Sequence, residues 1–410
     1  MGEYKMTRFA CYSAYFTMSS VFCVPALLFV TFRDLYGISY TLLGTLILVN
    51  FCTQLGVDLI FSVFSKRFNT KLTVRIMPLI TSLGLFIYAI IPMLYPNIAY
   101  IGLITGTVIF SLSAGLSEVL LSPVIAALPC DDPQKDMSLL HSLYAFGVFT
   151  MVVISTVFLY FFGNENWPYL VMILGALPII PALIFLRSPM PEMSSTADTE
   201  AKSSDAHLGL GILLCVCCIF FGSCAENAMG NWISTFMENA PGITKAVGDV
   251  LGVAMFAVLL GLARIGYAKF GKNILRVLLW GMIGAAFCYI VAGVSSNVTV
   301  SFFACILTGL FTSMLWPGTL ILLEEKIPHA GVAAYALMAA GGDLGAAIAP
   351  QIAGIVVDAA LKSGNSTAYA ELLTVNANQA SLMIGMLFCA LFPIVGVVLV
   401  LGIIRYFKKH

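Results

Sequence analysis

Two glutamates lie inside long apolar stretches of the sequence, where a carboxylate has no water to solvate it. Glu118 lies in Gly-Leu-Ser-Glu-Val-Leu-Leu-Ser-Pro at residues 115–123, and Glu226 opens the sequence Glu-Asn-Ala-Met-Gly-Asn-Trp. A charge at bilayer depth costs at least about 2.5–3.5 kcal/mol on insertion scales, so such acids usually face a water-filled cavity or a partner. Each carboxyl group is therefore a candidate for binding and releasing a proton, the alternative being a hydrogen-bonded structural acid. Glu118 is also predicted to bind substrate, as an acceptor for sugar hydroxyl groups.

The polar residues that follow Glu226 indicate a binding site for a polyhydroxylated ligand. Asn227 and Asn231 are four residues apart, so they share a helix face, and Trp232 comes next. Amides and acids bond hydroxyl groups, and an indole ring can stack on the C–H face of a sugar. We predict that Asn227, Asn231 and Trp232 bind substrate; polar contacts that join neighbouring helices are the alternative.

Two further apolar stretches carry polar side chains. Asn50, Gln54 and Asp58 step by four residues and share one helix face. We predict that Asn50 and Gln54 line a cavity, whereas Asp58 lies nearer the cytoplasm and is open to a structural role. His141 begins another stretch, with Tyr144 one turn later, and an imidazole can titrate in the physiological range. Both are predicted to bind substrate, and a satisfied interfacial histidine is the alternative.

Asp343 lies within Gly-Gly-Asp-Leu-Gly at residues 341–345, in the middle of a late apolar stretch. The glycines permit close backbone approach. Asp343 joins Glu118 and Glu226 as a proton-coupling candidate, or else pairs with a cation, and Trp316 completes the predicted substrate-binding set. The other acids of this half lie at the ends of apolar stretches, where we expect solvation: Asp249, Glu324, Glu325 and Asp358.

Several classes of protein are excluded by what the sequence lacks. No Gly-Lys-Ser/Thr loop is present, so ATP is not the expected energy source. No Cys/His spacing resembles a zinc site, and no constellation of nucleophile and base stands out. Most of the eleven cysteines lie in apolar runs, where cysteine behaves as a small hydrophobe. The net charge is zero, so nothing favours nucleic acid. We expect no enzyme, no metal and no cofactor.

Lipid is the solvent that the composition requires. The 410 residues are 60% hydrophobic and 10% charged, against about 25% charged in ordinary soluble proteins. A helix needs about 20 apolar residues to cross a bilayer. Twelve stretches qualify, at about 9–32, 39–63, 72–95, 98–127, 137–162, 167–186, 208–236, 246–268, 274–294, 299–323, 331–358 and 380–404. The sequence therefore predicts an all-α membrane protein of about twelve transmembrane helices.

The basic residues fix a predicted orientation. Cytoplasmic loops are rich in Lys and Arg. With the N-terminus inside, sixteen of the twenty Lys and Arg residues fall on the inner side, and only Arg33, Lys245 and Lys362 fall outside. Arg264 lies near the inner end of the eighth stretch. Both termini are therefore predicted to be cytoplasmic.

The two halves of the chain echo each other. Four residues recur at a fixed offset of 194 positions: Gly115 with Gly309, Pro123 with Pro317, Leu143 with Leu337 and Gly147 with Gly341. We predict a six-helix bundle over 1–186, a polar cytoplasmic linker over 187–206 and a second bundle over 207–410. Two pseudo-symmetric bundles of this kind are the layout of the major facilitator fold, in which substrate binds near the bilayer midplane.

The residues between 115 and 147 resemble the fucose permease-like branch of the major facilitator superfamily, the fucose–galactose–glucose proton symporters. Glu118, Pro123 and Phe146-Gly147 match that branch, and His141 stands where an amide commonly contacts sugar. The residues 227–232 resemble its polar, Trp-containing seventh helix. The resemblance implies a multi-pass protein of the cell membrane, in a bacterium the inner membrane.

From these residues we expect a monomeric secondary transporter that takes up a sugar or related polyhydroxylated molecule together with protons, by alternating access. Its partners would be that small molecule, protons and the lipid bilayer, with no nucleic acid. A proton-driven exporter of small organic compounds or drugs is the alternative on the same fold. A transport-inactive sensor is disfavoured, because the longest linker is only about twenty residues, at 187–206.

Overall fold

The computed structural model describes residues 4–64, 69–129, 133–191, 206–240, 242–327 and 331–409. These residues are almost entirely helical, as a chain in lipid requires, because a helix satisfies its backbone hydrogen bonds within one segment. The chain divides into two compact units. One comprises Met1–Ile38 and Val49–Ala197, and the other comprises Ser39–Leu48 and Asp198–His410.

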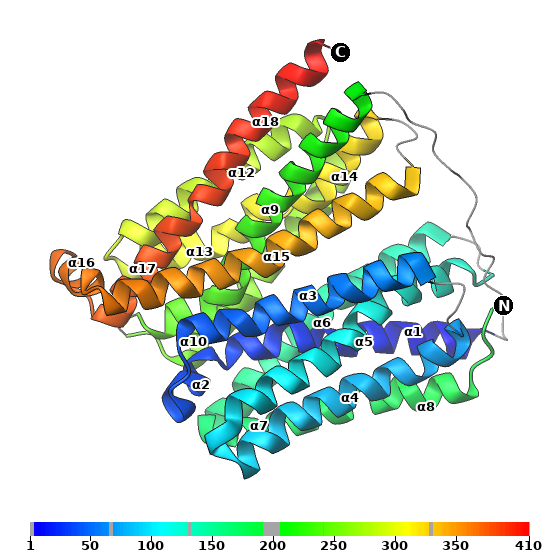
Figure 1. Cartoon of the computed structure of the whole chain (residues 1–410), viewed down its shortest axis with the longest axis horizontal. Coiled ribbons are helices and arrows are strands. Elements are labelled where there is room, and N and C mark those ends of the chain that lie inside the picture. Colours follow the sequence, from blue (N-terminus) through cyan, green and yellow to red (C-terminus); the bar gives the residue numbers. More distant parts are fainter. Residues whose placement is uncertain are drawn as a thin grey trace. The chain divides into compact units, whose positions relative to one another are not determined.

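The first unit is built from the helices of the N-terminal half, except that residues 39–48 belong to the second unit (Figure 1). In chain order they are α1 (Lys5–Leu27), α2 (Phe29–Tyr36), α3 (Tyr40–Phe64), α4 (Thr70–Leu94), η2 (Pro96–Ile98), α5 (Ala99–Ala126), α6 (Pro133–Phe162), η3 (Asn164–Asn166), α7 (Trp167–Ala176) and α8 (Ile179–Arg187). Helix α4 lies along α5, and α1 lies along α6. A proline at position 178 accompanies the break between α7 and α8, since proline cannot donate the hydrogen bond that continues a helix.

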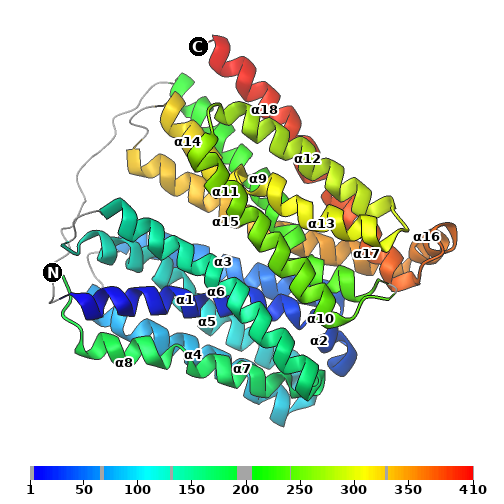
Figure 2. The same cartoon turned by 180° about the vertical axis from the view of Figure 1, so that it is seen from behind.

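The second unit repeats this plan (Figure 2). Its helices are α9 (Ala206–Glu238), α10 (Lys245–Val247), the π-helical segment η4 (Gly248–Ala254), α11 (Met255–Phe270), α12 (Ile274–Val294), α13 (Val298–Thr312), α14 (Leu315–Lys326), α15 (Gly331–Lys362), α16 (Asn365–Leu373), α17 (Ala377–Cys389) and α18 (Leu391–Lys409). Helix α15 lies along α9, and α12 along α13.

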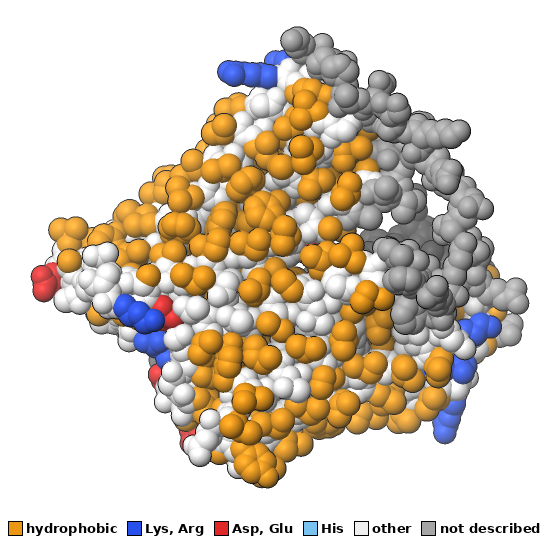
Figure 3. All heavy atoms as spheres, in the orientation of Figure 1, with side chains coloured by type: hydrophobic (Ala, Val, Ile, Leu, Met, Phe, Trp, Pro, Cys, Tyr) orange, Lys and Arg blue, Asp and Glu red, His pale blue; other side chains and the backbone are white. Residues whose placement is uncertain are grey.

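The expected membrane-spanning helices are present. Eleven segments of the described chain are long and apolar enough to cross a bilayer, and the stretch Phe146–Phe162 within α6 is a shorter apolar helix. Some spans consist of two helices in line, such as α13 with α14. Hydrophobic side chains cover most of the face seen in Figure 3, and the Lys, Arg, Asp and Glu in view gather near helix ends. The side of the membrane on which the termini lie stays a prediction.

The sequence echo at an offset of 194 residues corresponds to equivalent helix contacts. Gly115 of α5 lies against Gln54 and Val57 of α3, and its partner Gly309 of α13 lies against Phe256 of α11. In the same way, Gly147 brings α6 against α1, and Gly341 brings α15 against α9. Small residues let helix backbones approach closely where lipid gives no hydrophobic drive to associate. The repeat in the sequence therefore corresponds to a repeat of helix contacts in the two units.

Asp358 corrects the expectation of a solvated acid at a helix end. Its side chain is only 6% exposed. The carboxylate accepts hydrogen bonds from the backbone N–H of Tyr40 at 3.1 Å and of Thr41 at 2.7 Å. A carboxylate is stabilised there because the first N–H groups of a helix lack intrahelical partners. Asp358 of α15 thereby holds the first turn of α3, within the second unit.

The first residues of α3 pack with the second unit at glycines. Gly44 lies against the backbone of Pro350 and Gln351 of α15, and Gly354 lies against the backbone of Tyr40. The N-terminal bundle predicted at 1–186 therefore contains a segment, Ser39–Leu48, that packs with the other unit. The bundle boundaries read from the sequence stay a prediction, and most of the predicted linker lies outside the described residues.

The close approach at Gly309 predicts a difference between two glycine substitutions. In Gly309→Ala the new Cβ would overlap the Phe256 carbonyl, a backbone atom that cannot rotate away, so we expect a loss of about 1–3 kcal/mol in stability. The control is Gly261→Ala on α11, where a Cβ meets open space and stability should hold or rise by up to about 1 kcal/mol. Thermal denaturation in detergent measures both. Equal melting temperatures for the two variants would contradict the packing.

The capping contact of Asp358 predicts the effect of its removal. Asp358→Ala should lower stability by about 1–2 kcal/mol, because two backbone donors lose their acceptor. Glu324→Ala removes a carboxylate that is exposed at the end of α14 and should change little. The same denaturation assay applies. Equal melting temperatures for Asp358→Ala and Glu324→Ala would refute the role of the cap.

Candidate functional site

In the first unit, Glu118 belongs to a group of ionisable side chains on three helices. Helix α5 crosses α3 where Gly115 lies against Gln54. One turn further along each helix are Glu118 on α5 and Asp58 on α3, so the two acids lie at the same level. The Glu118 carboxyl group interacts electrostatically with Asp58 of α3 and with the Tyr15 hydroxyl of α1. Oδ1 of Asp58 is buried and has no hydrogen-bond partner among the described residues. The sequence singled out both acids but did not predict that they lie together.

Asn50 takes part in a hydrogen bond between two helices of the first unit, and Gln54 bonds to it within α3. Both are buried, Gln54 donates from Nε2 to Oδ1 of Asn50 at 2.9 Å, and Ser111 of α5 donates to the same oxygen at 2.6 Å. The bond from Ser111 to Asn50 joins α5 to α3, whereas the bond from Gln54 to Asn50 lies within α3. The predicted part of Asn50 and Gln54 in substrate binding is left untested.

His141 and Tyr144 lie in α6, but their side chains are outside the part of the chain that the structure describes. The predicted roles of these two residues in substrate binding therefore stay predictions.

In the second unit, the two asparagines of α9 bond to the helix that carries them. Asn227 donates from Nδ2 to the Ser223 carbonyl at 3.1 Å and to the Ser223 hydroxyl at 3.2 Å. Asn231 donates to the Asn227 carbonyl at 2.9 Å. Asn227 is half-buried, whereas Asn231 is buried. Bonds to the preceding turn hold both amides along one face of α9, as their spacing predicted.

Trp232 is packed into the second unit. It is 1% exposed, and its indole N–H donates to the Pro350 carbonyl of α15 at 3.0 Å. Its ring also contacts that of Tyr40, with 5.7 Å between the centroids. These are contacts of helix packing, and the predicted stacking on a sugar stays a prediction.

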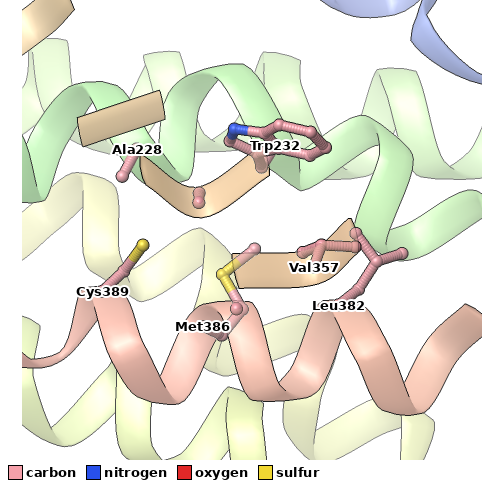
Figure 4. Close-up of a pocket in the computed structure, with 8 residues that line it drawn as sticks. Ala228, Trp232, Val357, Leu382, Met386 and Cys389 are labelled. Atoms are coloured by element: carbon pink, nitrogen blue, oxygen red, sulfur yellow. The ribbon is translucent and has the colours of Figure 1, made fainter. Parts of the chain in front are cut away.

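A small void lies beside Trp232 (Figure 4). Its volume is about 10 Å³, close to the space that one water needs. The lining is apolar and comes from α9, α15 and α17: Ala228, Trp232, Ala353, Val357, Leu382, Gly385, Met386 and Cys389. A void of this size cannot hold a sugar.

Glu226 forms an ion pair that the sequence did not reveal. Nη2 of Arg264 on α11 lies 3.5 Å from Oε1 of Glu226 on α9. Nε of Arg264 donates to the Ser313 carbonyl at 2.9 Å, between α13 and α14. Oε2 of Glu226 is buried and has no hydrogen-bond partner among the described residues. Arg264 therefore joins three segments of the second unit, although its position near the end of the eighth span suggested only a loop-side cation.

Pro317 explains why the Ser313 carbonyl is available to Arg264. In a regular helix the carbonyl of residue 313 would accept from the N–H of residue 317, but proline has no N–H. The carbonyl would be left without a partner, and the Arg264 guanidinium supplies one. The sequence contains the signal, because Pro317 is the repeat partner of Pro123, but its consequence depends on the position of α11.

Asp343 and Trp316 lie near each other in the second unit. The Trp316 ring of α14 rests against Gly342 of α15, so a Cβ at Gly342 would overlap the ring. Asp343, the next residue, is half-buried and makes an interaction of its own. The structure thus places Trp316 beside the glycine-rich segment of Asp343, and the roles predicted for both residues are untested.

Asp249 corrects a second expectation of solvation. It lies in η4 and is 1% exposed. Ser234 of α9 donates to Oδ1, and Nζ of Lys245 lies 3.5 Å from Oδ2 and 3.2 Å from Oε2 of Glu238. A lysine expected in an outer loop is thus part of a buried charge cluster, which the spacing of the residues alone did not indicate.

A wider cavity of about 440 Å³ lies in the first unit. It is apolar and is formed by α1, α6 and the junction of α7 and α8, with the lining residues Phe9, Tyr12, Ser13, Phe16, Thr17, Leu143, Leu177, Ile180 and Pro181. None of the proposed proton-coupling acids lines it.

Two units of membrane-length helices, each with ionisable groups held between its helices, are typical of a polytopic membrane transport protein. The chain belongs to the Major Facilitator Superfamily, whose family model matches residues 9–350. A search of curated proteins finds no match to the sequence. The family and the structural neighbours are membrane transporters, a class distinct from enzymes.

Solved structures of three transporters share the fold. A bacterial homologue of the human lysosomal transporter Spinster aligns with a TM-score of 0.75 at 14% identity, covering 98% of this chain and 97% of the other. A D-xylose–proton symporter gives 0.74 at 14% identity, with 95% and 96% covered. The E. coli fucose:proton symporter gives 0.57 at 15% identity, with 97% and 98% covered. The fold is shared with all three, and membership of the fucose permease-like branch stays a prediction.

The charge cluster around Asp249 predicts a large loss of stability when Lys245 is removed. Lys245→Ala leaves two carboxylates without their ammonium partner, and breaking a buried pair in this way typically costs about 3–5 kcal/mol. Lys362→Ala, at the exposed end of α15, is the matched control and should cost little. Denaturation in detergent compares the two, and similar melting temperatures would show that the cluster contributes nothing.

Proposed function

We propose that the chain is a secondary active transporter that couples the uptake of a sugar or related polyhydroxylated molecule to protons by alternating access. One observation carries the proposal. Each unit holds a carboxylate within its membrane-length helices beside a second ionisable group: Glu118 with Asp58, and Glu226 with Arg264. Ionisable groups at this depth are expensive and usually mark the path of a substrate or a proton.

The proton is assigned first to Glu118. Two carboxyl groups that interact in an apolar environment are suited to share a proton, because two adjacent negative charges repel each other strongly there. The interactions of Glu118 with Asp58 and Tyr15 therefore support a role of this group in proton exchange. Glu226 and Asp343 remain the other candidates for proton coupling.

The substrate class is supported by the amides of α9 and by two of the structural relatives. Asn227 and Asn231 present a polar face, and amides bond hydroxyl groups. The named substrates of the D-xylose–proton and fucose:proton symporters are sugars carried with protons. We propose a monomer in the cell membrane, in a bacterium the inner membrane.

A proton-driven exporter of small organic compounds is the second candidate. The apolar cavity of about 440 Å³ in the first unit favours it, because binding a hydrophobic compound there would desolvate few polar groups of the protein. Expression of the protein in cells tests this candidate. Resistance to toxic compounds, without any uptake of sugars, would favour the exporter.

Transport in proteoliposomes tests the proposal. With an acidic exterior, the wild-type protein should accumulate a labelled sugar above its outside concentration. In Glu118→Gln, accumulation should fall to the level seen without a gradient, because the residue can no longer exchange a proton, while exchange of labelled for unlabelled sugar should continue.

The matched control is Glu324→Gln, which removes an exposed carboxylate at the end of α14 and should leave accumulation intact. Full gradient-driven accumulation by Glu118→Gln would reject Glu118 as the coupling group. Absence of sugar uptake by the wild-type protein under any gradient would reject the proposed function itself.

A further inference from the structure

Arg264 has one edge of its guanidinium engaged and another edge open. Nε and Nη2 on one edge contact the Ser313 carbonyl and the Glu226 carboxylate. A guanidinium carries five N–H donors. These two bonds use two of them, and the remaining donors, including both on Nη1, have no partner among the described residues. The side chain is 42% exposed, so it is not closed off by the surrounding helices.

The open edge is held in place by two independent contacts. Pro317 leaves the Ser313 carbonyl without its helical donor, and this carbonyl accepts a hydrogen bond from Nε of Arg264 at 2.9 Å. Glu226 is fixed by α9, since its neighbour Ala225 accepts a hydrogen bond from the Tyr289 hydroxyl of α12 at 2.8 Å. A guanidinium anchored on one edge loses little further rotamer freedom when a ligand binds the other edge.

The depth of Arg264 also indicates a ligand-facing role. Helix side chains tilt toward the N-terminus of their helix, so Arg264 reaches back along α11 to the break between α13 and α14. A loop-side arginine would instead extend into water at the membrane surface. The carboxylate of Glu226 contacts a single nitrogen of the Arg264 guanidinium, so further N–H donors remain for a ligand.

We propose that Arg264 binds a negatively charged group of the substrate, so that the preferred substrates are sugar acids, that is, polyhydroxylated monocarboxylates, rather than neutral sugars. This inference rests on the proposed function and narrows its substrate class. The open Nη1/Nη2 edge presents two parallel N–H groups, the geometry that receives both oxygens of a carboxylate. Glu226 acts as the positioning residue that holds the guanidinium for this contact.

The charges of the pair favour a carboxylate over a phosphate. Glu226 already supplies one negative charge to Arg264. A sugar carboxylate adds a single charge on the far edge, whereas a phosphate monoester adds about two charges beside an existing carboxylate. No second Lys or Arg contacts Glu226 or Ser313 in the described chain. A monoanion therefore suits the site better than a dianion.

Binding and uptake of four matched ligands test this assignment. Glucuronate, gluconate, glucose and glucose 6-phosphate are compared by thermal shift of the purified full chain and by uptake into proteoliposomes. In the wild-type protein one of the two acids should bind at least tenfold more tightly than glucose, a difference of about 1.4 kcal/mol. The sugar phosphate should bind no better than glucose.

Three variants separate charge from geometry. Arg264→Gln should lose the preference for the acid, and Arg264→Lys should retain only part of it, because an ammonium keeps the charge but not the planar fork. Lys272→Gln removes an exposed cation in the loop before α12 and should behave as wild type. Should the Arg264 variants fail to fold, the preference of the wild-type protein among the four ligands still decides the question.

The outcomes distinguish this inference from the function on which it rests. Uptake of glucose without binding of either acid would overturn the role of Arg264 and leave proton-coupled sugar transport standing. An unchanged preference in Arg264→Gln would overturn it as well, as would binding of the phosphate alone. Failure of the wild-type protein to bind or take up any of the four ligands would reject the inference together with the proposed function.

Discussion

The absence of hydrogen-bonding solvent in a lipid bilayer governs this structure. A polar group between apolar helices must find its partner within the protein, because the surrounding hydrocarbon offers none. The backbone meets this demand by forming helices. The side chains meet it with local bonds, as Asn227 and Asn231 do with the preceding turn, or with bonds between helices, as Asn50 does with Ser111.

The same constraint explains where backbone irregularities matter. Pro317 deprives the Ser313 carbonyl of its helical donor, and the guanidinium of Arg264 takes that place. The free N–H groups at the start of α3 donate hydrogen bonds to the carboxylate of Asp358. In both cases a charged side chain satisfies a backbone group that the helix itself cannot. An ionised group is also the strongest hydrogen-bonding partner that a protein can offer in such a position.

The ionisable groups of the two units differ in a way that suggests a division of roles. The first unit holds acids, Glu118 and Asp58, near a phenol, which suits exchange of a proton. The second holds an acid with a cation, Glu226 and Arg264, which suits recognition of a charged ligand. Bundles related by pseudo-symmetry share their helix contacts, at Gly115 and Gly309 for example, but their polar residues are free to diverge.

The sequence by itself determined that the chain lies in lipid, that its fold is all-α, and that its two halves repeat each other. Apolar stretches of bilayer length require helices, and the recurrence of Gly115 at Gly309 indicates equivalent helix crossings, because a small residue permits a close approach. The sequence also identified Glu118 and Glu226 as acids inside apolar stretches. This could be recognised without the structure, because hydropathy depends on residue type alone.

Only the tertiary structure decided which groups those acids meet. Arg264 lies 38 residues from Glu226, and Asp358 lies more than 300 residues from the helix it caps. Asp249 and Asp358 were expected to be solvated, because their positions along the chain suggested helix ends, yet neighbouring helices bury both. Partners of this kind depend on how helices distant in sequence pack side by side, and no local pattern of residues encodes that packing.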